Sequence, residues 1–298
     1  MTSSHRIAER QDSAGALRLL KAVAVAHTRN QRAQAVSIGL SIALAVAGLL
    51  AGPGSSAAAA VAVGGTLWAA VYKAVMAPWA ERWLGTAATL QEMFDTDLLA
   101  LPWNRVAVGD RIGEEEVSRL GRRFRGEEEQ VRSYYLVANA AEPYAVLFCL
   151  EQNLVWGSRI RLRFAQTVLG VLVLWSAAGV LLTVAADATV SRLVTGWFVP
   201  SLGLLLLCLD SYRTQLASTR ERLRVLKLVR AVIDEPGSPV IGTPGALTLF
   251  ARQVQDTLYH MRRLQPRLPN WYFRHYHDQD KADFQVKMHE LEARFPRS

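Results

Sequence analysis

Forty consecutive residues without a charge, Ala33–Tyr72, decide the fold: AQAVSIGLSIALAVAGLLAGPGSSAAAAVAVGGTLWAAVY. An α-helix needs about 20 apolar residues to cross the hydrocarbon core of a bilayer. The block is therefore long enough for two such helices, and the turn-forming residues Gly52–Ser56 interrupt it midway. It predicts a hairpin of two transmembrane helices, at about Ala35–Ala51 and Ala57–Ala77.

Two further uncharged blocks lie closer to the C-terminus. Phe164–Ala186 contains 23 residues and Leu193–Leu209 contains 17, with six residues between them. These lengths predict a second hairpin, with spans at about Ala165–Ala186 and Leu193–Leu209. No segment alternates convincingly at period two, and the polar segments carry apolar residues at helical spacing. We therefore expect an all-α membrane protein with four transmembrane helices in two hairpins and a helical cytosolic region.

The segments around these blocks divide the chain. The first 32 residues are polar, so the first apolar block lies too far from the start to be an ordinary signal peptide. Val131–Arg163 predicts a long helix, either continuous or beginning anew at Pro143, that continues into the third span. The expected domains are an N-terminal cytosolic amphipathic helix at 1–34, transmembrane hairpin 1 at 35–77, a cytosolic helical loop at 78–164, transmembrane hairpin 2 at 165–209 and a cytosolic helical tail at 210–298.

Lysine and arginine residues lie almost entirely on one side of the predicted spans. Six precede the first span, eleven lie in 78–164 and fifteen lie from residue 211 onward. The first hairpin loop has none, and the second has only Arg192. Because basic residues are retained on the cytoplasmic side, both termini and the central loop are expected there.

A cluster of basic residues follows the fourth span directly. Its members are Arg213, Arg220, Arg222, Arg224, Lys227 and Arg230. A basic cluster beside a membrane is expected to contact anionic lipid headgroups. Nucleic acid would use the same charges, but the position beside the bilayer favours lipid, and we expect no direct nucleic-acid partner.

The first span carries small residues at every fourth position. Gly39, Ala43 and Ala47 form one such ridge, which lets helix backbones approach closely in lipid. Packing within the hairpin and packing between subunits both explain it. The hydroxyls inside the spans are candidates for a pore-facing surface: Ser37, Ser41, Ser176, Thr183, Thr195 and Ser201. Alternatively, each bonds a carbonyl of its own helix.

Catalytic motifs are absent from the sequence. It contains no Walker loop, GxGxxG, HExxH, GxSxG or CxxC motif. The two cysteines, Cys149 and Cys208, have no metal-binding spacing. No acid or base lies deep in a span, which disfavours an ion-coupled transporter. We therefore expect no enzyme activity, no cofactor and no metal.

One polar motif stands out in the central loop. Phe94-Asp95-Thr96-Asp97 is followed by Leu101-Pro102-Trp103-Asn104. Together with Asn153, Trp156 and Trp271, and with Gln255-Asp256 and Arg262-Arg263 near the end, it resembles the SMODS-associated four-transmembrane effector family. The resemblance covers essentially the whole chain, although Gly157 occupies a position where it implies an acidic residue.

The resemblance implies a function that composition alone does not. Members are predicted pore-forming proteins encoded beside nucleotide-oligomer synthases in bacterial antiphage systems. We therefore expect a signal-gated effector, a homo-oligomer that forms a pore in or disrupts the bacterial inner membrane. The implied partner is a cyclic oligonucleotide or the nucleotide synthase. The alternative is a membrane-anchored scaffold or sensor that conducts nothing.

Overall fold

The structure is a computed structural model that describes residues 3–51, 55–136, 144–235, 237–265 and 267–294. Helices account for its regular structure, and no strand occurs in these ranges. This confirms the all-α fold class. The chain divides into two compact units. Unit 1 comprises 1–29, 83–160 and 218–298, and unit 2 comprises 30–82 and 161–217.

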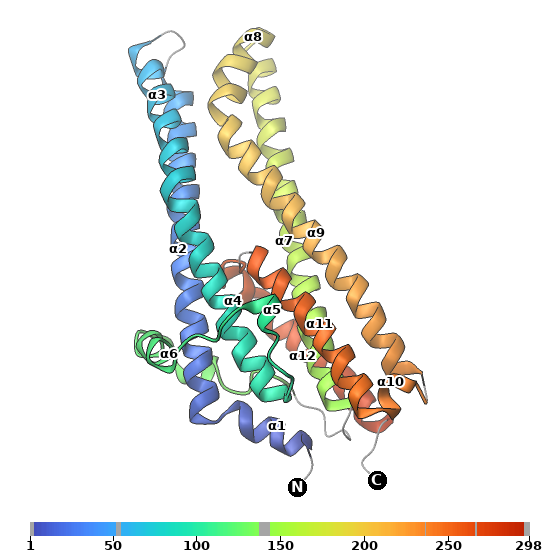
Figure 1. The fold of residues 1–298 in the computed structure, drawn as a ribbon. Coiled ribbons are helices and arrows are strands. Elements are labelled where there is room, and N and C mark those ends of the chain that lie inside the picture. Colours follow the sequence, from blue (N-terminus) through green and yellow to red (C-terminus); the bar gives the residue numbers. More distant parts are fainter. Residues whose placement is uncertain (1–2, 52–54, 137–143, 236, 266, 295–298) are drawn as a thin grey trace. The chain divides into compact units, whose positions relative to one another are not determined.

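Long helices dominate the chain (Figure 1). They are α2 (Ala14–Leu50), α7 (Tyr144–Ala185), α9 (Val199–Asp234), α11 (Pro244–Leu264), α12 (Asn270–Arg294), and the run of α3 (Ser56–Val71), η1 (Tyr72–Met76) and α4 (Ala77–Leu99). Shorter elements are α1 (Ser3–Gln11), α5 (Arg105–Val108), α6 (Glu114–Gly121), η2 (Glu128–Gln130), α8 (Val190–Leu193), η3 (Val194–Phe198) and α10 (Pro239–Gly242).

Among the described residues, three helical stretches are long and apolar enough to cross a membrane: Ser56–Leu99, Tyr144–Ala185 and Val190–Asp234. They contain the second and fourth predicted spans and all but the last residue of the third. The first predicted span, Ala35–Ala51, is not among the three. It lies mainly in α2 and includes Leu49, whose side chain is outside the part of the chain that the structure describes. That span stays a prediction.

Unit 2 is held together by close contacts at small residues. A Cβ placed on Gly48 would stand 2.7 Å from Cβ of Pro200, and one on Gly179 would stand 2.4 Å from the Trp197 ring. Trp197 also stacks against Trp175, with ring centroids 4.8 Å apart. Glycine is needed at both positions because a side chain would occupy the space of its neighbour.

Unit 1 has a conventional apolar core. Its largest fully buried apolar side chains are Ile7, Leu90, Phe94, Leu120, Tyr135, Leu147, Phe148, Leu150, Leu154 and Leu258. They come from α1, α4, α6, α7, α11 and the segment before α7. The core therefore joins segments from both ends and the middle of the sequence.

The continuous form of the helix predicted at Val131–Arg163 is wrong at residues 131–136, whereas the alternative that begins anew at Pro143 agrees with the helix observed from Tyr144. α7 begins at Tyr144, residues 131–136 are not helical, and 137–143 lie outside the described residues. The physical reason is side-chain competition for the backbone. The N–H of Tyr135 donates to Gln11 Oε1 at 2.9 Å, and that of Leu136 donates to Gln152 Oε1 at 3.0 Å.

Candidate functional site

The last turns of α4 bury polar side chains inside unit 1. Glu92 and Asp95 have no exposed surface, and Gln91 and Thr96 are also buried. Ala100 ends the helix with a positive φ of 53°, and the N–H of Leu101 bonds the Thr96 carbonyl at 3.0 Å. This is a left-handed helix cap. Two buried carboxylates are costly unless partners of opposite charge satisfy them.

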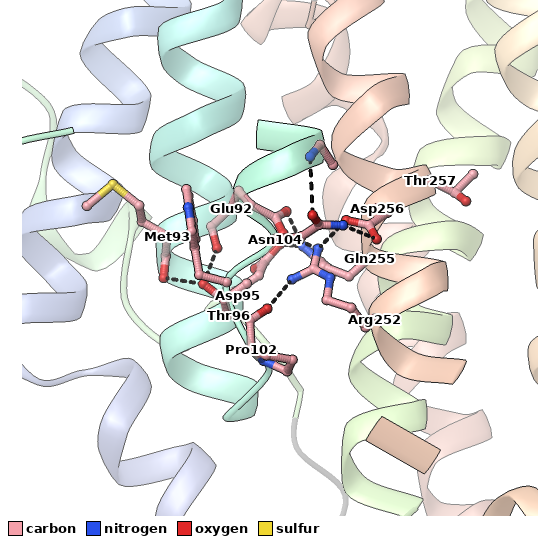
Figure 2. A network of polar contacts seen from close by, with 12 residues as sticks. Glu92, Met93, Asp95, Thr96, Pro102, Asn104, Arg252, Gln255, Asp256 and Thr257 are labelled. Atoms are coloured by element: carbon pink, nitrogen blue, oxygen red, sulfur yellow. Dashed lines mark hydrogen bonds and ion pairs between the residues drawn. The ribbon is translucent and has the colours of Figure 1, made fainter. Parts of the chain in front are cut away.

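Those partners come from α11, which faces the end of α4 (Figure 2). Arg252 forms an ion pair with Glu92, and Arg262 forms one with Asp95 at 2.5 Å. Between them, Gln255 Nε2 donates to Glu92 Oε2 at 2.8 Å and to Asp95 Oδ2 at 3.0 Å. We call Glu92, Asp95, Arg252, Gln255 and Arg262 the α4–α11 clasp. Its two acids and two bases balance in charge.

Electrostatics in the clasp follow from burial. Burial raises the pKa of Glu92, and Arg252 opposes this by favouring the charged form. Burial alone would lower the pKa of Arg262, but Asp95 overcomes it and holds that pKa above its usual range. The Gln255 Oε1 atom is buried and has no hydrogen-bond partner within the described residues. Each carboxylate of the clasp therefore has an ion-pair partner, but the buried hydrogen-bond acceptor of Gln255 lacks a donor among the described residues.

Hydrogen bonds extend the clasp to two more helices. The Tyr135 hydroxyl donates to Asp95 Oδ1 at 2.8 Å and accepts from Asn153 Nδ2 of α7 at 2.6 Å. Arg222 Nη1 of α9 donates to the Asn153 carbonyl at 3.3 Å. Burial raises the pKa of Tyr135 well above its ordinary value, so the hydroxyl stays a donor. The network thus reaches α4, α7, α9 and α11.

The Leu101-Pro102-Trp103-Asn104 motif lies at the edge of the clasp. Asn104 caps α5 by accepting from the N–H groups of Val106 and Ala107, and its Nδ2 donates to Asp256 Oδ2 at 2.9 Å. Arg252 Nη1 donates to the Pro102 carbonyl at 3.1 Å. This motif therefore fixes the loop after α4 against α11.

Neighbouring motif residues have local structural roles. Trp103 is half-buried, and its Nε1 donates to the Gly109 carbonyl at 2.9 Å while Arg111 lies over the ring. Leu101 is buried in the core, and Asp97 forms an ion pair with Arg111 outside the buried network.

The structure thus brings some predicted site residues together and separates others. Asp95, Asn104, Asn153 and the Pro102 carbonyl belong to one network. Trp156 packs elsewhere, against Phe284 at 5.9 Å between ring centroids, and Trp271 is 65 % exposed.

Sequence analysis did not single out Glu92, Arg252 or Tyr135. Glu92 lies three residues before Asp95, and Arg252 three before Gln255, so each pair shares a helix face. This three-residue spacing is the sequence feature that could have identified Glu92 and Arg252 as partners of the motif residues.

The candidate ridge and hydroxyls of the spans lie in unit 2. Gly39 and Ala43 are exposed, Ala47 is partly buried, and a Cβ on Gly39 would meet nothing within 4 Å. Ser176, Thr183, Thr195 and Ser201 each donate to the carbonyl four residues earlier in their own helix. Ser37 and Ser201 are buried and Ser41 is partly buried. A pore-facing role for these hydroxyls stays a prediction.

The clasp does not have the arrangement of a catalytic centre. Its carboxylates are neutralised by guanidinium groups, and burial raises the pKa of the nearby thiol of Cys149. Within the described residues, no group of three or more His, Cys, Asp or Glu side chains can hold a metal ion. The geometry favours a structural or switching role for these charges.

Comparison with known proteins identifies the family of the chain. The model of the SMODS-associating 4TM effector domain matches residues 5–291. The chain belongs to this family. The matched range contains every residue of the α4–α11 clasp and all four predicted spans of this 4TM effector.

A curated relative gives more detail. The chain is 22 % identical over 188 residues to a protein of Bacillus cereus (strain VD146) named "Probable CBASS effector molecule". The match covers 62 % of this chain and 62 % of that protein. No solved structure matches this 4TM effector.

Proposed function

We propose that this 4TM effector is a signal-gated membrane effector of a nucleotide-second-messenger antiphage system. Membership of the effector family and the similarity to a probable CBASS effector support this role. The observation that carries the gating is the clasp, which joins α11 to α4, together with the hydrogen bonds of Tyr135, Asn153 and Arg222 that extend it to α7 and α9. Each of these three helices belongs to a stretch apolar enough to cross a membrane.

The clasp has the properties of a two-state restraint. It is buried and balanced in charge, so it holds α4 and α11 in one arrangement. The unpartnered Oε1 of Gln255 lowers the stability of that arrangement, since a partly satisfied buried network is costly. A ligand that binds better to an arrangement with α11 displaced shifts the equilibrium toward it. Displacement of α11 would release α4, which continues from the second predicted span.

Conduction requires several subunits. One chain has few polar side chains in its predicted spans, so a ring of subunits is the economical way to enclose water. The exposed Gly39–Ala43 part of the ridge suits contact between subunits, because small residues permit close helix packing in lipid. The proposal includes the predicted topology: the four spans form two hairpins in the inner membrane, and both termini lie in the cytoplasm. The exposed members of the basic cluster, Arg213, Arg220, Arg224 and Lys227, would contact anionic lipids. Arg222 is buried and Arg230 forms an ion pair with Glu151, so these two are removed from the predicted lipid contact.

The signal in this proposal is a cyclic oligonucleotide or a contact with the synthase that makes it. The second candidate function is a membrane-anchored scaffold or sensor without conduction. The low number of polar side chains in the predicted spans favours that alternative. Neither function involves catalysis by this chain.

Membrane potential tests the proposal. Cells that express the effector are loaded with a potential-sensitive dye, with and without an active cyclic-oligonucleotide synthase. Depolarisation that needs both proteins is expected. A potential that never changes, together with no ion flux from proteoliposomes given the cyclic oligonucleotide, would favour the scaffold.

A pair of variants tests the clasp as the gate. Gln255→Met removes the donor shared by the two carboxylates, and Gln253→Met changes the exposed glutamine two residues earlier. We expect Gln255→Met to depolarise cells without the synthase, and Gln253→Met to behave as wild type. Identical signal dependence of both variants would remove the clasp from the gating mechanism.

A further inference from the structure

The connection between α11 and α12 exposes large apolar side chains. Leu264 is 60 % exposed and Trp271 is 65 % exposed. Arg263 and Arg274 are exposed beside them. We call Arg263, Leu264, Trp271 and Arg274 the α11–α12 surface. An exposed tryptophan among arginines is unusual for a surface in water, but it is typical of the membrane–water interface.

Buried side chains flank Trp271 in this surface. Tyr272 is buried and packs edge-on against the Trp271 ring, with centroids 5.5 Å apart. Leu268, in the same connection, is also buried. The exposure of Trp271 is therefore fixed by the burial of its neighbours.

Two contacts inside unit 1 connect neighbours of this surface to α7, close to the third predicted span, and to α9, nine residues beyond the fourth. Phe273 lines a small cavity with Trp156 and Ile160 of α7. The Ser218 hydroxyl of α9 donates to Gln265 Oε1. Ile160 precedes the third predicted span by five residues of uninterrupted helix, which is about 7.5 Å. A headgroup layer is roughly 5–8 Å thick.

We propose that the α11–α12 surface inserts into the headgroup layer of the bilayer, with Trp271 and Leu264 at the acyl boundary and Arg263 and Arg274 on anionic headgroups. This contact is separate from the basic residues on α9. It gives the effector a peripheral attachment, and the α11 part of it, Arg263 and Leu264, belongs to the same helix that supplies Arg252, Gln255 and Arg262 to the clasp. Lipid contact and clasp geometry are therefore connected through one helix, α11.

The inference rests on the membrane arrangement in the proposed function but not on conduction. Its test uses the full chain with Cys149→Ala and Cys208→Ala, reconstituted in vesicles that contain phosphatidylglycerol. Single cysteines at Leu264, Trp271, Leu249 or Leu174 carry an environment-sensitive fluorophore. Leu249 is the matched control, because it is 61 % exposed on the same helix and about 22 Å from Leu264. Leu174, in the third predicted span, is the control within the membrane.

Blue-shifted emission that spin-labelled lipids quench is expected at positions 264 and 271, as at 174, and neither effect is expected at 249. Emission at 264 and 271 that matches 249 would overturn the proposal. Blue-shifted emission without lipid quenching would also overturn it, because a second copy of the chain would then cover the surface. Quenching at 174 but not at 264 and 271 would refute the surface contact and leave the proposed spans intact. Quenching would be reduced by Arg263→Gln with Arg274→Gln, or in vesicles that lack phosphatidylglycerol.

Discussion

Arg222 of α9 lies directly against Gly157 of α7. A Cβ placed on Gly157 would stand 2.5 Å from Nη1 and 2.8 Å from Cζ of Arg222. The Arg222 side chain is buried and donates to the Asn153 carbonyl, the outermost hydrogen bond of the network. Position 157 is where the family resemblance implies an acidic residue, and in this chain it is a glycine with the Arg222 guanidinium against it. The guanidinium fills the space of the missing side chain.

Gly157→Ala should therefore displace Arg222 and destabilise the protein. Replacing glycine by alanine inside a helix normally stabilises it by roughly 0.5–1 kcal/mol. Here the loss of a buried hydrogen bond and its desolvation, about 1–3 kcal/mol, should outweigh that gain and leave a net destabilisation of up to about 2 kcal/mol. The measurement is the thermal midpoint in detergent. Gly85→Ala on α4 is the control, since a Cβ there meets nothing within 4 Å, and equal midpoints for the two variants would contradict the contact.

Arg262→Met should be among the most damaging single changes in unit 1. It leaves the buried carboxylate of Asp95 without its ion-pair partner, which typically costs about 3–5 kcal/mol. The free energy of unfolding of the solubilised protein measures this cost. Arg263→Met removes the same charge from an exposed neighbour and should change stability by less than about 0.5 kcal/mol. Similar losses for both variants would show that charge number, rather than the ion pair, matters.

Glu92 should make the protein less stable as pH rises. Its pKa in the folded state is raised, mainly by burial, above the ordinary value of 4.5. From pH 4.5 up to the raised pKa, the folded state binds more protons than the unfolded state, so the free energy of unfolding falls with pH. The groups facing Glu92 are Arg252, Gln255 and Asp95. Glu92→Gln has no proton to lose at this position. The difference in the free energy of unfolding between variant and wild type should therefore change between pH 4.5 and the raised pKa of Glu92. A constant difference from pH 4.5 to 7 would contradict it.

Both hairpin loops should face the outside of the cell. A cysteine introduced at Ser55, in a variant whose two native cysteines are replaced by alanine, should react with an impermeant maleimide in intact cells. A cysteine at Val106, which is 99 % exposed in unit 1, should react only after permeabilisation. Labelling of position 106 and not 55 in intact cells would reverse the orientation derived from the basic residues.

The ridge of α2 should act between subunits and not within one chain. Gly39→Leu adds bulk where a Cβ meets nothing within 4 Å, whereas Gly48→Leu would collide with Pro200. Gly39→Leu and Ala43→Leu should therefore insert and fold normally but fail to depolarise cells when the signal is present. Gly48→Leu should lower the thermal midpoint. Normal depolarisation by Gly39→Leu and Ala43→Leu would exclude the ridge from assembly.

The sequence by itself determined the all-helical class and the apolar segments, because a span needs only a long uncharged run and the chain supplies several. The motif residues Asp95 and Asn104 were also identifiable, through the family resemblance. Local sequence failed at Val131–Tyr135, where Gln11, more than a hundred residues away, bonds the backbone in place of a helix.

Only the tertiary structure decided which charges are buried and which apolar side chains are exposed. Glu92 and Arg252 are 160 residues apart, and each alone resembles a solvated charge on a helix. Trp271 and Tyr272 are adjacent large aromatic residues, and only the structure shows that Tyr272 is buried and Trp271 is exposed. The physical reason is that helical spacing assigns residues to faces, whereas burial depends on which face another segment covers. That choice follows from the free energy of the whole packed unit.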